Sequence, residues 1–529
     1  MLPKSLHYCL VTLKQLLPSL FNIISTKMQY FSLLGLLFGS FLIHRYLRAR
    51  KEQRVLDAIA REHGCLPPPL LQNQRPLGVD RLEQIFRAEA ETRLMELFLF
   101  HFRQTGYTLK QVFLMTPAYG TVDPANLEAI FSTNFSGIVC PLYRVPMIDG
   151  SSIVLTRTYL LKIGLLVQEE TSPFPCLGME FSPKKVTQQY ENLELFREPI
   201  EDLLQVLPKT GGVVDLQPLF FRLTLDVTTA FLFGKSIHSL LTPKDSQEQT
   251  FAQAFDTAQS YVASRFRLLD LYWLIGGKKW RDACAKVHMF ADQIIDQNLS
   301  NSETAEGQND GRYVFLKSVA KASPDRASLR GQIINILAAG RDTTACLLSW
   351  TLHPRVMEKL RSEVSALPVK EEEMRRTDLR NLSYLQNILK EIPVNTRTST
   401  KTTILPTGGG PDRKSPVLIP KGTAVAYSIY TLHRRPDLYG MDAECFRPER
   451  WDEDLPLFRD RTTQSYGYLP FSGGPLDFAL TEAAYIITRI LQRYPKIALP
   501  EGEKIELVGV EKQTTTFKWY KLVKVPVHR

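Results

Sequence analysis

The sequence predicts a mainly α-helical fold with small β-sheets, which places the chain in the α+β class. Apolar residues recur at three- and four-residue steps from Phe478 to Leu491, and residues 329–351 have the composition of a long buried helix. Residues 108–115 (TLKQVFLM) instead follow the pattern of a strand. The 529 residues suit one large domain with an appendage, or roughly two to three smaller domains.

Charge and cysteine usage narrow the function classes. The net charge is +10 and the isoelectric point is about 9.1, without a long Lys/Arg run. This balance favours an anionic membrane surface or an acidic protein partner, and we expect no nucleic-acid binding. The seven cysteines are scattered and form no C-x-x-C pair, so we expect reduced thiols and neither a zinc site nor a disulfide framework.

The N-terminal region predicts membrane attachment. Residues 28–43 are apolar and uncharged, and a basic cluster follows at residues 44–51. The run nearly spans a hydrocarbon core of about 30 Å, and the basic flank predicts a cytosolic position for the rest of the chain. An earlier apolar stretch, residues 6–24, is broken by a lysine and a proline, so it is either interfacial or a second span. A cleaved signal peptide is disfavoured because no small-residue cleavage site follows.

These features divide the chain into three parts. Residues 1–51 are predicted to be the anchor with its basic flank, and residues 52–79 a proline-rich hinge that includes the triple proline ending at Pro69. The remainder, residues 80–529, is predicted to be the main folded domain. Within it, Asp80 is expected to cap one helix, and Asp123 with the following proline to begin another.

The long apolar segment 329–351 contains the hexapeptide Ala-Gly-Arg-Asp-Thr-Thr at residues 339–344. Gly340 weakens a helix by about 1 kcal/mol relative to alanine. The two threonines offer hydroxyls to the carbonyls of the preceding turn. Arg341 is unusual in an apolar helix without a charged partner, and the sequence identifies none.

A second motif lies near the C-terminus. Phe471 ends an extended segment, and the adjacent glycines Gly473 and Gly474 predict a tight loop because glycine tolerates positive φ. From Phe478 onward the pattern becomes helical. A glycine-rich loop therefore leads into a buried helix.

The loop resembles the haem-binding loop of the cytochrome P450 family, which reads Phe-x-x-Gly-x-Arg-x-Cys-x-Gly and supplies a Cys thiolate to the iron. Phe471 and Gly474 match this pattern and are implied to contact haem b. Phe478 stands where the Cys is required, so the resemblance provides no metal ligand in this chain. Cys445 is the tempting substitute, but its position in the family lies outside the haem pocket.

The hexapeptide resembles the same family's oxygen-activation motif, in which an acid and an alcohol relay protons to bound dioxygen. By that match Asp342 and Thr343 are the catalytic pair. Ala339 and Gly340 are implied to leave room for dioxygen beside the haem.

A third resemblance concerns an ion-pair triad beneath the haem. Glu391 matches the Glu of the family's Glu-x-x-Arg helix, but Val394 stands in place of the Arg and Pro393 would end the helix. Arg450 matches the Arg of the Phe-x-Pro-Glu-Arg segment. The resemblance therefore implies a structural pair of Glu391 and Arg450 where the family has three members.

The resemblance covers roughly residues 30–144 and 180–525, with an atypical interval at 145–177, so a partly disrupted cytochrome P450 fold is expected. It is closest to the fungal microsomal branch that hydroxylates n-alkanes and fatty acids at the chain end. The implied partners are NADPH-cytochrome P450 reductase, membrane lipid and a hydrophobic small-molecule substrate. The implied location is the endoplasmic reticulum membrane, with one span and a cytosolic catalytic domain.

Other interpretations stay open because the haem-ligating Cys is absent. The chain could be a haem-free, inactive relic of the family, or the translation of a gene model that lacks short exon pieces. A cytochrome P450 that oxidises a secondary metabolite is a further alternative. Whether the chain as written is an enzyme is therefore left undecided by the sequence.

Overall fold

In the structure, a computed structural model, the chain forms two units, residues 1–66 and residues 67–529. It describes residues 39–41, 43–113, 116–133, 138–139, 144–146, 152–154, 193–209, 212–243, 246–268, 273–304, 326–352, 354–368, 373–390, 395–399, 401–469, 477–497, 511–513, 517–519 and 524–527.

In the first unit, residues 43–62 are helical. Across the described part of the chain, no helix is both long and apolar enough to cross a membrane. The predicted span at residues 28–43 falls almost wholly outside the described residues. The anchor therefore stays a prediction.

The second unit contains a five-stranded sheet. Its edge strand β1 confirms the strand that the sequence predicts at residues 108–115. The strand order is β1-β2-β10-β7-β3. β10 pairs in parallel with β2, placing Val425 opposite Tyr119, and the other neighbours are antiparallel. The strands are β1 (Thr108–Phe113), β2 (Thr116–Thr121), β3 (Ile138–Val139), β7 (Asn395–Ser399) and β10 (Ala424–Tyr427).

Four two-stranded sheets complete the β structure of the described residues. The pairs are β4 (Arg144–Pro146) with β5 (Ser152–Val154), β6 (Gly212–Asp215) with β13 (Lys524–Val527), β8 (Thr403–Gly409) with β9 (Ser415–Ile419), and β11 (Glu511–Gln513) with β12 (Phe517–Trp519).

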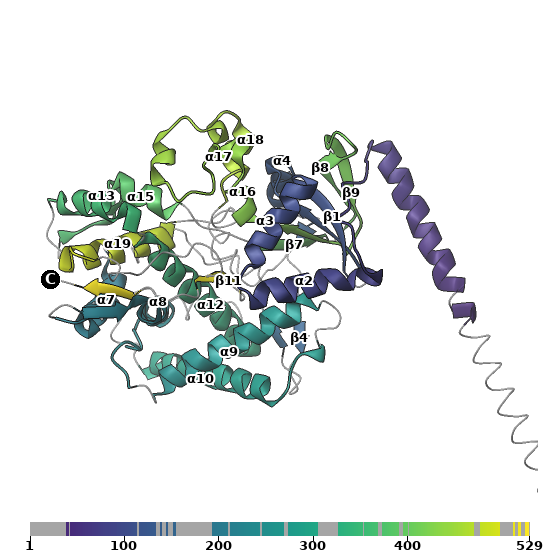
Figure 1. The fold of residues 1–529 in the computed structure, drawn as a ribbon. Coiled ribbons are helices and arrows are strands. Elements are labelled where there is room, and N and C mark those ends of the chain that lie inside the picture. Colours follow the sequence, from purple (N-terminus) through teal and green to yellow (C-terminus); the bar gives the residue numbers. More distant parts are fainter. Residues whose placement is uncertain are drawn as a thin grey trace, which may run out of the picture. The chain divides into compact units, whose positions relative to one another are not determined.

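Helices make up most of the described chain (Figure 1). The longer ones are α2 (Val79–Ala90), α3 (Leu94–Thr105), α7 (Glu194–Val206), α8 (Leu216–Phe233), α9 (Gln247–Arg267), α10 (Lys278–Thr304), α12 (Arg326–Thr351), α13 (Pro354–Ser365) and α19 (Asp477–Arg493). The shorter ones are η1 (Pro76–Gly78), α4 (Pro124–Glu128), η2 (Ala129–Thr133), α14 (Arg376–Arg380), α15 (Ser383–Leu389), α16 (Ile429–Leu432), α17 (Pro436–Tyr439), η6 (Pro448–Asp452), η7 (Pro456–Phe458) and α18 (Arg461–Tyr466).

Two predicted helix caps have different outcomes. Asp123 does cap α4, since its carboxylate accepts a hydrogen bond of 3.0 Å from the amide of Ala125. The prediction for Asp80 was wrong, because α2 begins at Val79 and its N-cap is Gly78, two residues before Asp80. Gly78 has φ 75°, and a Cβ there would lie 2.2 Å from the carbonyl oxygen of Val112. Only glycine fits this turn, and it sets the start of the helix in place of the aspartate.

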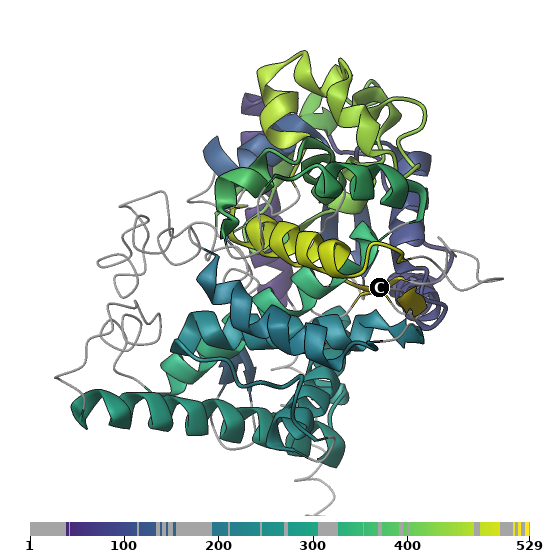
Figure 2. The ribbon, with the colours of Figure 1, turned by 90° about the vertical axis from the view of Figure 1, so that its left-hand side faces the viewer.

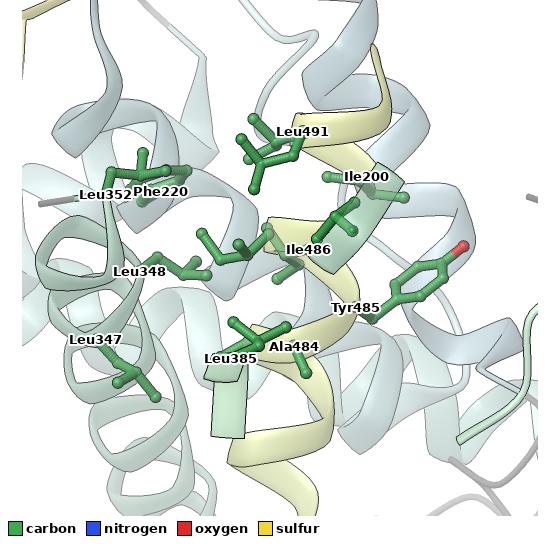
Figure 3. Close-up of a cluster of buried hydrophobic side chains, with 14 of the residues drawn as sticks. Ile200, Phe220, Leu347, Leu348, Leu352, Leu385, Ala484, Tyr485, Ile486 and Leu491 are labelled. Carbon is green, nitrogen blue, oxygen red and sulfur yellow. The ribbon is translucent and has the colours of Figure 1, made fainter. Parts of the chain in front are cut away.

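α12 lies at the centre of the helical part of the second unit. It packs along α8 and also contacts α19 and α10. Figure 2 shows α19 running between the green helices α13 and α15 on one side and the teal helices on the other. Figure 3 shows the core where these helices meet, with Leu348 of α12, Phe220 of α8 and Ile486 of α19 directed toward one another. The helix and strand content confirms the predicted fold class.

Candidate functional site

The predicted catalytic residues lie in the middle of α12. Asp342 and Thr344 are buried, whereas Thr343 between them is exposed. Between Leu329 and Thr351 of α12, Thr343 is the one exposed residue among those whose burial is described. Ala339 lies on the same helix, one turn before Thr343.

Gly340 lies where α12 packs tightly against α8. A Cβ at this position would lie 2.4 Å from the hydroxyl oxygen of Thr228. One turn earlier on α8, the Thr224 hydroxyl donates a 2.7 Å hydrogen bond to the backbone carbonyl of Arg341. Within the described structure, Gly340 therefore serves helix packing, and its predicted role beside dioxygen stays a prediction.

Arg341, for which the sequence identified no partner, has two acidic ones. Its Nη1 atom lies 2.8 Å from Asp256 of α9 and 3.1 Å from the adjacent Asp342. The guanidinium also lies over the rings of Phe221 and Phe255, 5.1 and 5.7 Å from their centroids. Paired charge and aromatic faces together explain how an arginine is buried in this helix.

Glu482 of α19, which belongs to none of the three sequence motifs, is 1% exposed. Burial raises the pKa of its carboxyl group well above the usual range, against the opposing hydrogen bond from Thr344. The Oε1 atom of this carboxyl group has no hydrogen-bond partner among the described residues. A glutamate inside the apolar pattern that follows Phe478 was the available signal.

Phe478 stands at the position matched to the axial Cys, and its ring is engaged in packing. It lies 5.5 Å from the ring of Phe196 and 5.1 Å from that of Phe231. The Phe478 side chain packs against two separate clusters of buried apolar side chains. The predicted loop residues Phe471 and Gly474 lie outside the described residues.

The cysteines do not compensate for the missing ligand. The sequence contains no Cys after Cys445, which is exposed in the turn before η6. The other described thiols are Cys65, Cys284 and Cys346, and none lies on α19. The residues present therefore do not fit a thiolate-ligated haem.

Arg450 is 1% exposed and anchors the turn before it. Its guanidinium donates to the carbonyl oxygens of Tyr439 and Asp442 at 3.1 and 3.0 Å, and lies 3.4 Å from the Asp442 carboxylate. Glu391 lies outside the described residues, so the predicted pair of Glu391 and Arg450 stays a prediction.

Comparisons with known proteins identify the class. Residues 177–508 match the family model described as Cytochrome P450. A protein named Cytochrome P450 from Arthroderma benhamiae (strain ATCC MYA-4681 / CBS 112371) is 38% identical over 500 residues, covering 90% of this chain and 94% of that protein. Cytochrome P450 52A12 from Debaryomyces hansenii is 33% identical over 487 residues, covering 85% and 90%. The crystal structure of the cytochrome P450DA heme domain shares the fold, with a TM-score of 0.63 and 20% identity over 88% of this chain and 98% of that one.

Fold and sequence thus define a member of the haem-dependent monooxygenase class. The chain belongs to the cytochrome P450 family. The predicted family and its fungal branch are confirmed. Haem as cofactor, a redox partner and hydrophobic substrates are properties of that family, whereas haem binding by this chain is not shown. The relatives match most of the chain, so the departure at Phe478 is local.

Proposed function

We propose that this protein hydroxylates n-alkanes or fatty acids at the chain end. The observation that carries the proposal is the extended similarity to fungal proteins that include Cytochrome P450 52A12. Electrons would come from NADPH through NADPH-cytochrome P450 reductase, and the net charge of +10 suits an acidic partner.

The described residues support this chemistry on the α12 side. Thr343 is exposed on α12, and its hydroxyl is the group proposed to hydrogen-bond a bound molecule. Asp342 beside it is buried and is proposed as the acid that supplies the proton. We assign these two residues the proton-relay role. Phe471 and Gly474 would hold the haem edge, with Arg450 and Glu391 supporting the loop.

The 529-residue chain does not complete the site, because its residue at the axial position is Phe478. The active form therefore requires a short segment carrying Arg, Cys and Gly before Phe478. We infer that this segment is missing at an exon boundary. The losses fall in the most rigid segments of the family, and the interval 145–177 is atypical. Faulty exon boundaries explain that combination more simply than selection for a new role does.

We further propose that the protein resides in the endoplasmic reticulum membrane, with residues 1–51 as a single-pass anchor, 52–79 as the hinge and 80–529 as a cytosolic catalytic domain. Membrane lipid would deliver the apolar substrate. The apolar, uncharged run at residues 28–43 and the basic residues after it support this topology.

Transcript sequencing across residues 340–482, followed by microsomal expression with the reductase, tests the proposal. The completed chain should hydroxylate laurate or an n-alkane, and the 529-residue chain should not. A transcript that encodes the printed sequence would favour the second candidate, a haem-free binding protein. The aromatic packing of Phe478 between Phe196 and Phe231 is the observation that supports that candidate.

A further inference from the structure

We propose that Arg341 is a positioning residue for Asp342, and that Asp256 of α9 holds Arg341 in place. The part that concerns oxygen chemistry rests on the proposed function, in which Asp342 belongs to the proton relay. The ionic arrangement itself is a property of the chain as it stands, and it can be tested without haem.

One nitrogen atom serves both acids. The Nη1 atom of Arg341 donates to Asp256 at 2.8 Å and to Asp342 at 3.1 Å. An Nη1 atom carries two hydrogens, so it can satisfy both carboxylates at once. The orientation of the guanidinium toward Asp342 is thereby fixed by a residue that lies on another helix.

The rest of the side chain is equally constrained. Phe221 of α8 and Phe255 of α9 face the guanidinium, and the backbone carbonyl of Arg341 accepts the Thr224 hydroxyl. The arginine is therefore held by α8, α9 and α12 together. A residue that only filled space would not need two acids and two aromatic faces.

The two acids differ in their exposure to water. The Asp342 side chain is 0% exposed, whereas that of Asp256 is 49% exposed. Without the guanidinium, water can still solvate Asp256, but Asp342 becomes a buried charge with its compensating cation removed. Neutralising Asp342 should therefore restore the stability that is lost with the arginine charge, whereas neutralising Asp256 should not restore it.

This asymmetry defines the experiment, a urea unfolding series on the full 529-residue chain. Arg341→Gln should lower the unfolding midpoint. Arg341→Gln with Asp342→Asn should raise the midpoint again, and Arg341→Gln with Asp256→Asn should leave it low. If Arg341→Gln yields no folded protein, the proposal predicts that the double variant with Asp342→Asn folds and that the one with Asp256→Asn does not. The proposal is overturned if both double variants behave alike or if Asp342→Asn gives no recovery.

Arg330 provides a matched control on the same helix, since it pairs with the partly exposed Asp292 at 2.7 Å. Arg330→Gln should not be rescued by Asp292→Asn.

The series needs neither haem nor substrate. Failure of a completed chain to hydroxylate any alkane or fatty acid would count against the proposed function alone, whereas failed rescue would count against the role of Arg341 alone.

Discussion

The hydroxyl of Tyr384 on α15 donates a 2.9 Å hydrogen bond to the carboxylate of Glu449 on η6. Asn387 and Asp452 join the same two elements at 2.9 Å. These bonds dock the segment that carries Arg450 onto the helix that leads to Glu391. The predicted Glu391–Arg450 pair would join the same two segments of the chain.

We predict that Tyr384→Phe lowers the free energy of unfolding by about 1 kcal/mol. A bond to a charged acceptor is worth about 1.5–3 kcal/mol, and the figure is reduced here because the Glu449 side chain is 42% exposed. Urea unfolding measures the change, with Tyr466→Phe on α18 as the control. An unchanged midpoint for Tyr384→Phe would mean that the two elements are held together by apolar contacts alone.

Acid stability should depend on His433. The imidazole Nε2 accepts a 3.1 Å hydrogen bond from the amide of Leu469, so the neutral ring is required. Burial, with a smaller effect from the Arg434 charge, lowers the pKa of His433 from 6.5 to about 3. A folded-state pKa below the unfolded value gives stability that is present above about pH 6.5 and is lost as pH falls toward 3.

Between pH 7 and pH 4 this histidine should remove about 3 kcal/mol of stability. His433→Gln keeps an acceptor for the Leu469 amide but does not titrate, so its unfolding free energy should fall less over that range. Replacement of the exposed His63 by Gln is the control. Parallel pH profiles for His433→Gln and the unmodified chain would contradict the assignment.

The printed chain should not form a thiolate-ligated haem protein, because Phe478 occupies the axial position and no Cys follows Cys445. After expression with haem supply, the chain is reduced, carbon monoxide is added, and the Soret band is recorded. We expect no band at the position typical of thiolate ligation. A stoichiometric band there would overturn this prediction and show that a distant Cys reaches the iron.

Restoring the haem loop alone should not restore full activity. Inserting Arg-x-Cys-x-Gly between Pro475 and Phe478 supplies the ligand, but Glu391 and Arg450 would still lack the third member of their triad. An incomplete buried ionic network commonly costs about 3–5 kcal/mol, a large share of a typical stability of about 5–15 kcal/mol.

Bound haem per protein and its thermal loss distinguish the repairs. The loop repair should give low or unstable haem, and adding a complete Glu-x-x-Arg helix after Lys390 should raise it. Laurate hydroxylation is assayed alongside. Stable stoichiometric haem from the loop repair alone would exclude the assigned role of Glu391 and Arg450.

Deleting residues 1–60 should release the remainder of the chain from microsomes in high salt. The uncharged run at residues 28–43 motivates this expectation. Sedimentation after a salt wash measures it, with the full chain as the reference. If the shortened chain sediments as firmly, the catalytic domain binds membrane by itself.

Local signals were sufficient for much of the fold. The helices α12 and α19 follow from the spacing of apolar residues, and the Asp123 cap follows from its position before a proline. The start of α2 could not be predicted, because the turn at Gly78 is imposed by the backbone of Val112.

The site was less accessible to sequence reasoning, because its determinants act across helices. The motif located Asp342 and Thr343, but the Asp256 partner of Arg341 lies 85 residues earlier in the chain. Nothing in the periodicity of either segment aligns those two positions.

The aromatic contacts of Phe478 have a consequence for any lengthened form of the chain. A helix turns by about 100° per residue, so a change of register in α19 by even one residue would swing Phe478 away from Phe196 and Phe231. It would also rotate Glu482 away from Thr344. The contacts of these side chains thus fix the rotation of α19 about its own axis. Added residues must therefore lie in the chain before Asp477. A completed loop therefore lengthens only the connection before α19, and the side chains of the helix keep their present contacts.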